Sequence, residues 1–216
     1  MCIRDRRCAA DLFRPAFEAT DGVDGWVSME VSPLLANDTA GSIDAAARIH
    51  DQADRPNLFV KIPGTLAGVP AIQESIFAGV PINVTLLFSR EQYLASAEAY
   101  MRGIERRLDA GLSPRVASVA SLFVSRWDKA VAEKVPAELR NKLGLAIAGR
   151  AHRAYRELLA SPRWKALAAR GARPQRLLWA STGVKDKAAS PTLYVCLLYT
   201  SPSPRDRTRS RMPSSA

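Results

Sequence analysis

Five apolar segments with polar side chains near their carboxyl ends alternate with helical patterns, and together they predict an α/β fold whose parallel strands form a barrel. The strand-like segments are residues 26–33, 57–65, 82–88, 116–124 and 177–183. A helical segment follows most of them, as crossover connections in parallel sheets require. Such barrels build their functional sites at the carboxyl ends of the strands, so polar residues there are the candidates.

The second segment, NLFVKIPGT, carries the strongest chemical signal because Lys61 lies near the end of an otherwise apolar run. Burying an ammonium group without a partner is costly, so burial favours the neutral amine. A neutral lysine amine attacks carbonyl groups and forms a Schiff base. The structural alternative is a lysine that extends into solvent at the strand end.

The other segments carry polar residues in comparable positions. The first segment alternates, which places Ser28, Glu30 and Ser32 on one face and apolar residues on the other. The remaining candidates are Asn83 and Thr85 in the third segment, Ser121 in the fourth with Arg126 just beyond it, and Ser181 at the end of the fifth.

Helical periodicity and capping residues predict the connecting elements. The expected helices are residues 9–19, 39–53, 68–79, 90–110, 128–135, 137–143, 144–159 and 162–170. Residues 37–39 offer capping side chains to the second of these helices, and Ser89 offers one to the fourth. Residues 186–195 are expected to form a loop.

Length and composition restrict the functional classes. The chain has 216 residues, of which 47% are hydrophobic, and an eight-stranded barrel needs about 250. No apolar run approaches the ~20 residues of a membrane helix, and the start lacks a secretory signal. A cytoplasmic enzyme without membrane contact is the expectation.

The net charge of +10 raises the question of nucleic-acid binding. Half of the excess lies in residues 1–8 and 196–216, and the body has no basic stripe interleaved with aromatic residues. We therefore expect no nucleic-acid partner. Both ends resemble translated sequencing-adapter sequence, and the Ser/Pro/Arg-rich residues 201–216 are predicted to be disordered. All three cysteines lie in or beside these ends, so no disulfide or thiolate metal site is expected.

The motifs VSMEVSP, VKIPGT, INVTLLFS, VASVASLFVSRWD and LLWASTG resemble the transaldolases, in that order. The resemblance covers residues 9–195 and implies a TIM-type (β/α)8 barrel, here a truncated one with strands three to seven. The first-strand aspartate and second-strand asparagine of the family have no match. Residues 1–8 and 196–216 are left outside the partial barrel as spurious or disordered ends.

The resemblance implies Schiff-base transfer of a dihydroxyacetone unit between phosphorylated sugars in the pentose phosphate pathway, with no metal or other cofactor. The donor is sedoheptulose 7-phosphate or fructose 6-phosphate, and the acceptor is an aldose phosphate. The implied roles are Lys61 as the Schiff-base lysine, Glu30 and Thr85 as holders of a proton-relaying water, Asn83, Ser121, Arg126 and Ser181 as substrate ligands, and Lys185 as a candidate second phosphate cation. Gly64 departs from the family, where alanine is usual.

Three alternatives remain open at this point. Another lysine-dependent (class I) phosphosugar aldolase would share the Schiff base, a non-catalytic barrel fragment would need none of these residues, and a basic binding protein would depend on the tail. Since the first-strand aspartate performs the family's acid–base step, this chain is expected to turn over poorly. A homo-oligomer of the full-length parent is a further partner that the resemblance allows.

Overall fold

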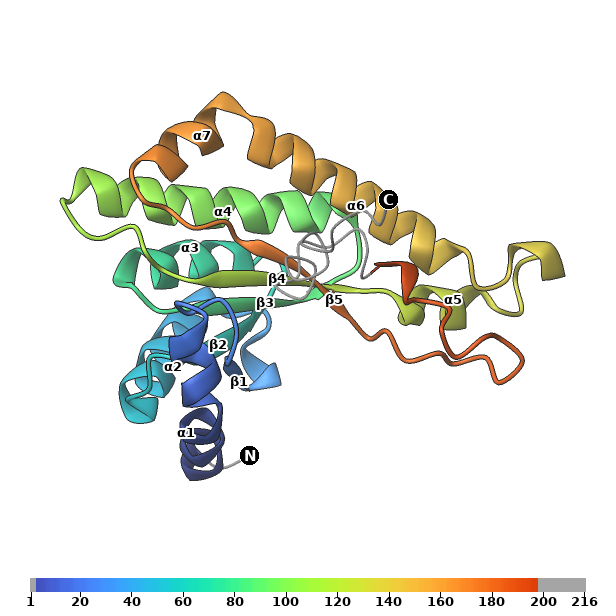
Figure 1. Ribbon diagram of the computed structural model, residues 1–216, viewed down its shortest axis with the longest axis horizontal. Coiled ribbons are helices and arrows are strands. Elements are labelled where there is room, and N and C mark those ends of the chain that lie inside the picture. The colour runs from blue at the N-terminus through green and yellow to red at the C-terminus, as the bar shows by residue number, and fades with distance from the viewer. Residues whose placement is uncertain (1–2, 198–216) are drawn as a thin grey trace, which may run out of the picture.

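The computed structural model describes residues 3–197 and contains a five-stranded parallel sheet (Figure 1). The strands are β1 (Val27–Glu30), β2 (Leu58–Pro63), β3 (Ile82–Leu87), β4 (Ser118–Phe123) and β5 (Arg176–Ala180). Each strand pairs with the next in the sequence, and all four pairs are parallel. The predicted α/β class and all five strands are therefore confirmed. An order that never reverses is that of a barrel wall, unlike a doubly wound sheet.

Seven helices accompany the strands within the described residues. They are α1 (Ile3–Ala19), α2 (Thr39–Ala53), α3 (Gly68–Ala78), α4 (Arg90–Asp109), α5 (Ser125–Val131), α6 (Leu143–Ala160) and α7 (Pro162–Ala169), with 3-10 turns η1 (Pro33–Leu35) and η2 (Ala137–Leu139). Two predicted caps are confirmed, because Asp38 accepts a hydrogen bond from the Gly41 amide and Ser89 accepts one from the Gln92 amide. No helix within residues 3–197 is both long and apolar enough to cross a membrane.

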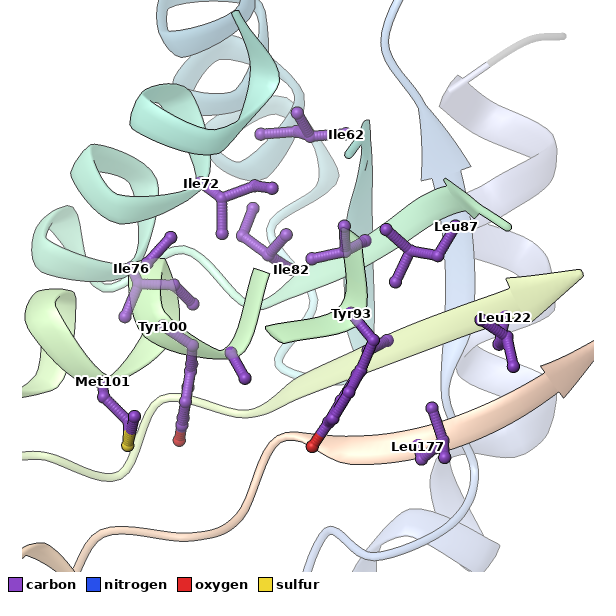
Figure 2. Packing of buried hydrophobic residues seen from close by; sticks show 14 of the residues in the cluster. Ile62, Ile72, Ile76, Ile82, Leu87, Tyr93, Tyr100, Met101, Leu122 and Leu177 are labelled. Atoms are coloured by element: carbon purple, nitrogen blue, oxygen red, sulfur yellow. The ribbon is translucent and has the colours of Figure 1, made fainter. Parts of the chain in front are cut away.

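The hydrophobic core lies between one face of the sheet and the helices that cover it (Figure 1). Figure 2 shows Ile72 and Ile76 of α3 directed toward the strands that carry Ile62 and Ile82. All four side chains are fully buried, and burial of each contributes about 1.5–3 kcal/mol. Successive residues of a strand project from opposite faces of the sheet. This packing therefore turns one set of strand residues toward the helices, and the residues of the opposite face can be polar.

Three helix predictions were wrong in their limits, and one of them, over residues 128–135, is replaced by α5 at Ser125–Val131. Helix α1 begins at Ile3 rather than at residue 9, so residues 3–8, which were expected to lie outside the fold, form its first turns. Ile3 packs against the core, and Arg55 of the α2–β2 connection pairs with Asp11 of α1. The predicted helix over residues 137–143 is only the turn η2, because Asn141 adopts a left-handed backbone with φ of 60°. The predicted disorder of residues 201–216 lies outside the described residues.

The turn between α1 and β1 bridges the two outer strands at the amino end of the sheet. Arg176, in β5, donates a hydrogen bond to the Val23 carbonyl at 2.6 Å. Arg173, just before β5, donates to the backbone carbonyl and the carboxylate of Asp21. Burial lowers the pKa of Arg176, with Asp24 acting in the opposite direction. The first and last strands, which do not pair with each other, are thus connected through this turn.

Asn57 is the buried residue that joins α1 to the sheet. Its side-chain Nδ2 donates to the Ala10 carbonyl of α1 at 2.8 Å and to the Gly25 carbonyl before β1 at 2.9 Å. The residue is fully buried. Buried carbonyl groups that lose such donors cannot regain them from water without a structural change.

Replacing Asn57 with Ala should therefore lower the free energy of unfolding by about 1–3 kcal/mol, as measured by urea denaturation. Asn37→Ala is the matched control, because that side chain is exposed and makes no hydrogen bond within residues 3–197. The free energy of unfolding of the control variant should fall by less than about 1 kcal/mol. Equal losses in the two variants would show that Asn57 does not hold α1 to the sheet.

Candidate active site

The strand register places three of the predicted site residues side by side. Glu30 of β1 is opposite Lys61 of β2, and Lys61 is opposite Asn83 of β3. Laterally paired residues in a sheet project from the same face, and Thr85 shares that face because it lies two residues beyond Asn83. Glu30, Lys61, Asn83 and Thr85 therefore meet on the face opposite the helices, at the carboxyl end of the sheet.

Lys61 and Glu30 form the ion pair at this position. The distance between Lys61 Nζ and Glu30 Oε2 is 3.3 Å, and the two side chains are 26% and 47% exposed. Lys61 is thus neither buried without a partner nor extended freely into solvent, the two alternatives that the sequence left. A pair this exposed contributes little to stability, typically less than about 1 kcal/mol. Its value lies in placing a carboxylate beside an amine that solvent and ligands can reach.

Asn83 is held in one orientation by two serines. Ser121 Oγ donates to Asn83 Oδ1 at 2.8 Å, and Asn83 Nδ2 donates to Ser28 Oγ at 3.2 Å. Asn83 and Ser121 are buried, so these bonds persist without competition from bulk water. Ser28 was not among the predicted site residues, although the alternation of its strand had already placed it on the polar face with Glu30.

Arg126 and Ser181 lie at the carboxyl ends of β4 and β5. Arg126 is exposed in the first turn of α5 and has no hydrogen bond or ion pair within residues 3–197. Ser181 is partly buried, and its hydroxyl lies 3.1 Å from the hydroxyl of Ser125. The strand ends thus bring a free guanidinium and a hydroxyl to the same end of the sheet as Lys61.

Lys185 lies in the loop that follows β5. It lines a pocket with Lys129, Arg140 and Asn141, to which Arg126 does not contribute. The loop that carries Lys185 is fixed by the hydrogen bond from Asn141 to Asp186 and by one from the Tyr194 hydroxyl to Asp128. Burial and the bond to Asp128 raise the pKa of Tyr194, so the hydroxyl stays protonated as a donor. The role of Lys185 as a second phosphate cation stays a prediction.

No metal centre accompanies this site in the described part of the chain, where no three His, Cys, Asp or Glu side chains come together as ligands would. The reactive groups are an amine, a carboxylate, hydroxyls and an amide. A lysine amine beside a carboxylate, at the carboxyl ends of parallel barrel-type strands, defines the class of candidate Schiff-base enzymes on an α/β barrel wall.

Comparison with known proteins narrows this class to a family. The model of the family described as Transaldolase/Fructose-6-phosphate aldolase matches residues 1–202, and the chain belongs to that family. The transaldolase of Acidothermus cellulolyticus is 50% identical over 198 residues, which cover 88% of this chain and 53% of the relative. The transaldolase of Thermobifida fusca is also 50% identical, over 199 residues that cover 88% and 54%.

A less similar relative is matched over a comparable share of its length. Transaldolase 2 of a Nostoc species is 42% identical over 208 residues, which cover 88% of this chain and 55% of the relative. The chain thus spans about half the length of the curated relatives it matches. The family predicted from the five sequence motifs is confirmed.

Gly64, directly after β2, is the departure from the family motif that the structure explains. A Cβ added at Gly64 would overlap Cδ2 of Leu87 and approach Cγ1 of Val84. Leu87 is fully buried, so it cannot move aside without disturbing its neighbours. The space that a methyl group would need at this position is occupied by the Leu87 side chain.

Gly64→Ala should therefore destabilise the fold by about 1–3 kcal/mol through overpacking, measured by thermal or urea unfolding. Gly149→Ala is the control, because a Cβ at that position of α6 meets no atom within 4 Å. Alanine in a helix is favoured over glycine by about 1 kcal/mol, so the control should be neutral or stabilising. A neutral Gly64→Ala variant would show that Leu87 adapts freely.

Proposed function

We propose that this chain provides the Schiff-base chemistry of a transaldolase, which moves a dihydroxyacetone unit from a ketose phosphate to an aldose phosphate. Sedoheptulose 7-phosphate or fructose 6-phosphate is the donor. The observation that carries the proposal is the 3.3 Å approach of the Lys61 amine to the Glu30 carboxylate on neighbouring strands. The names of the relatives support it, and so does the Asn83–Ser121 hydrogen bond next to that pair.

We also propose that the five strands correspond to strands three to seven of an eight-stranded barrel, within a partial barrel of residues 9–195. Their sequential parallel order supports this assignment, as does the span of about half of the relatives' length. The family's first-strand aspartate has no counterpart among the five strands of residues 3–197. Imine formation at Lys61 is therefore separable from carbon–carbon cleavage.

In the first step Lys61 loses its ammonium proton to solvent through the relaying water, and the amine then attacks the C2 carbonyl carbon of the ketose phosphate. The carbonyl oxygen gains a proton to give a carbinolamine, and loss of water then leaves an iminium ion. Glu30 accepts the proton that the attacking nitrogen releases and returns one to the departing hydroxyl, with Thr85 helping to hold the relaying water. Asn83 and Ser121 bind substrate hydroxyls, and Arg126 binds the phosphate through charge-assisted hydrogen bonds.

The second step belongs to the full-length parent, where the family's first-strand aspartate takes the proton of the C4 hydroxyl and the C3–C4 bond breaks. The electron pair moves to the iminium nitrogen, which leaves an enamine on Lys61 and releases an aldose phosphate. The enamine carbon then attacks the aldehyde carbon of the acceptor, and hydrolysis of the new iminium frees the amine. A class I aldolase would release its three-carbon product instead of transferring it. A product assay with and without an acceptor aldose separates the two.

The lysine assignment is tested by trapping the imine. Sodium borohydride added with fructose 6-phosphate should reduce the iminium to a stable secondary amine, which peptide mass mapping should locate on Lys61. Lys61→Arg keeps the positive charge but cannot form the imine, so it should show no adduct. An adduct on Lys129 or Lys185, or none on folded protein, would contradict the assignment.

The role of Glu30 is tested by the rate of the same trapping reaction. Glu30→Gln keeps the shape but removes the proton acceptor, so imine formation should slow roughly 10²-fold while the affinity for fructose 6-phosphate is retained. Glu18→Gln is the control, because Glu18 is an exposed glutamate whose partner is Arg14 of the same helix. Equal rates in the Glu30 variant and the unmodified chain would assign the ion pair a structural role only.

A further inference from the structure

Ser125 is fully buried between the carboxyl ends of β4 and β5. Its backbone amide donates to the Ser181 carbonyl at 2.9 Å, one step beyond the bond from the Val124 amide to the Ala180 carbonyl. Its hydroxyl lies 3.1 Å from the Ser181 hydroxyl. Main chain and side chain together thus fix Ser181 to the start of α5.

The Ser125 hydroxyl does not cap helix α5. Serine commonly caps a helix by accepting a hydrogen bond from an amide of the first turn. In α5 the capping position is Val124, and no side chain caps the helix. The Ser125 hydroxyl is directed at Ser181 instead, which adopts a left-handed backbone with φ of 52°. Residues other than glycine rarely adopt this conformation, so contacts such as those of Ser125 must hold it.

The hydroxyl pair also determines which proton remains available. Only one of two hydrogen-bonded hydroxyls donates in the pair, and the accepting hydroxyl keeps its own proton for another partner. Ser125 is enclosed, whereas Ser181 is partly exposed. When Ser125 donates, the Ser181 proton is free to donate to a ligand at the carboxyl end of the sheet.

Arg126 lies between two anchored residues. Ser125 is bound to Ser181, and Trp127 Nε1 donates to the Phe88 carbonyl after β3 at 2.7 Å. The Arg126 backbone is therefore fixed from both sides, while its side chain is exposed and unpaired within residues 3–197. A fixed backbone with a free guanidinium reduces the ordering cost of binding an anion.

We propose that Ser125 is a positioning residue that sets the Ser181 hydroxyl and the Arg126 guanidinium as one unit for binding the substrate's phosphate group. The inference rests on the proposed function, because that function supplies the phosphorylated sugar. Ser125 itself does not touch the ligand. Its contribution is the orientation of the two groups that do.

The experiment compares two buried serines of the same strand region. Ser125→Ala removes the contact to Ser181, and Ser118→Ala removes hydrogen bonds to Ile82 and Gln175 at the opposite, amino end of β4. Phenylglyoxal modifies arginine side chains, and inorganic phosphate bound at Arg126 should protect that residue. Peptide mass mapping gives the phosphate concentration for half protection of Arg126, and thermal unfolding reports on the fold.

Half protection should require about 3- to 10-fold more phosphate in Ser125→Ala, with no change in Ser118→Ala even though both variants melt earlier. Ser125→Cys fills nearly the same space with a weaker hydrogen-bond donor, so it provides the test if Ser125→Ala does not fold. The double variant of Ser125→Ala with Ser181→Ala should lose no more protection than Ser181→Ala alone, because the two hydroxyls act together.

Unchanged protection in folded Ser125→Ala, an equal loss in Ser118→Ala, or no protection of Arg126 in the unmodified chain would each overturn the inference. Borohydride trapping at Lys61 distinguishes this failure from failure of the proposed function. If Lys61 is trapped while Ser125 has no effect, only the positioning role is wrong. If trapping fails while protection depends on Ser125, the phosphate site stands and the Schiff-base assignment falls.

Discussion

The register between three neighbouring parallel strands is the constraint on which the site depends. Glu30, Lys61 and Asn83 come from segments far apart in the sequence, and they meet only because their strands pair at these positions. A slip of one residue in any strand would turn its polar residue toward the helices and an apolar one toward the site. The chemistry of the site is therefore inseparable from the packing that fixes the register.

That packing acts on the other face of the same strands. Leu58, Val60 and Ile62 alternate with Phe59 and Lys61, and all three are fully buried against the helices. Moving such a run of residues to the solvent side would forfeit several kcal/mol, which is far more than the exposed Lys61–Glu30 pair can contribute. Burial of the apolar residues thus fixes the strands. The polar residues on the opposite face are not needed for that packing and can serve the chemistry of the site.

Local patterns in the sequence were sufficient for the strands and for the polar residues that the strand register brings side by side. Alternation in residues 26–33 placed Glu30, and an interrupted apolar run marked Lys61. The contacts of Ser125 and Arg176 could not be predicted, because each depends on a partner more than fifty residues away. The start of α1 was not predicted, because the composition of residues 1–8 indicated no structure. The packing of Ile3 against the core, which favours the helix there, cannot be read from the sequence.

The position of Arg126 supports a functional reading. Some arginines in the described structure have carboxylate partners: Arg163 pairs with Glu105 and Glu98, which raise its pKa, and Arg173 pairs with Asp21. Arg126 has no such partner within residues 3–197, although the residues on both sides of it are anchored. Folding alone gives no reason to fix the backbone of an unpaired cation at the end of the sheet that carries Lys61. The anionic ligand that we propose would supply that reason, because it completes the guanidinium's hydrogen bonds only when it is bound.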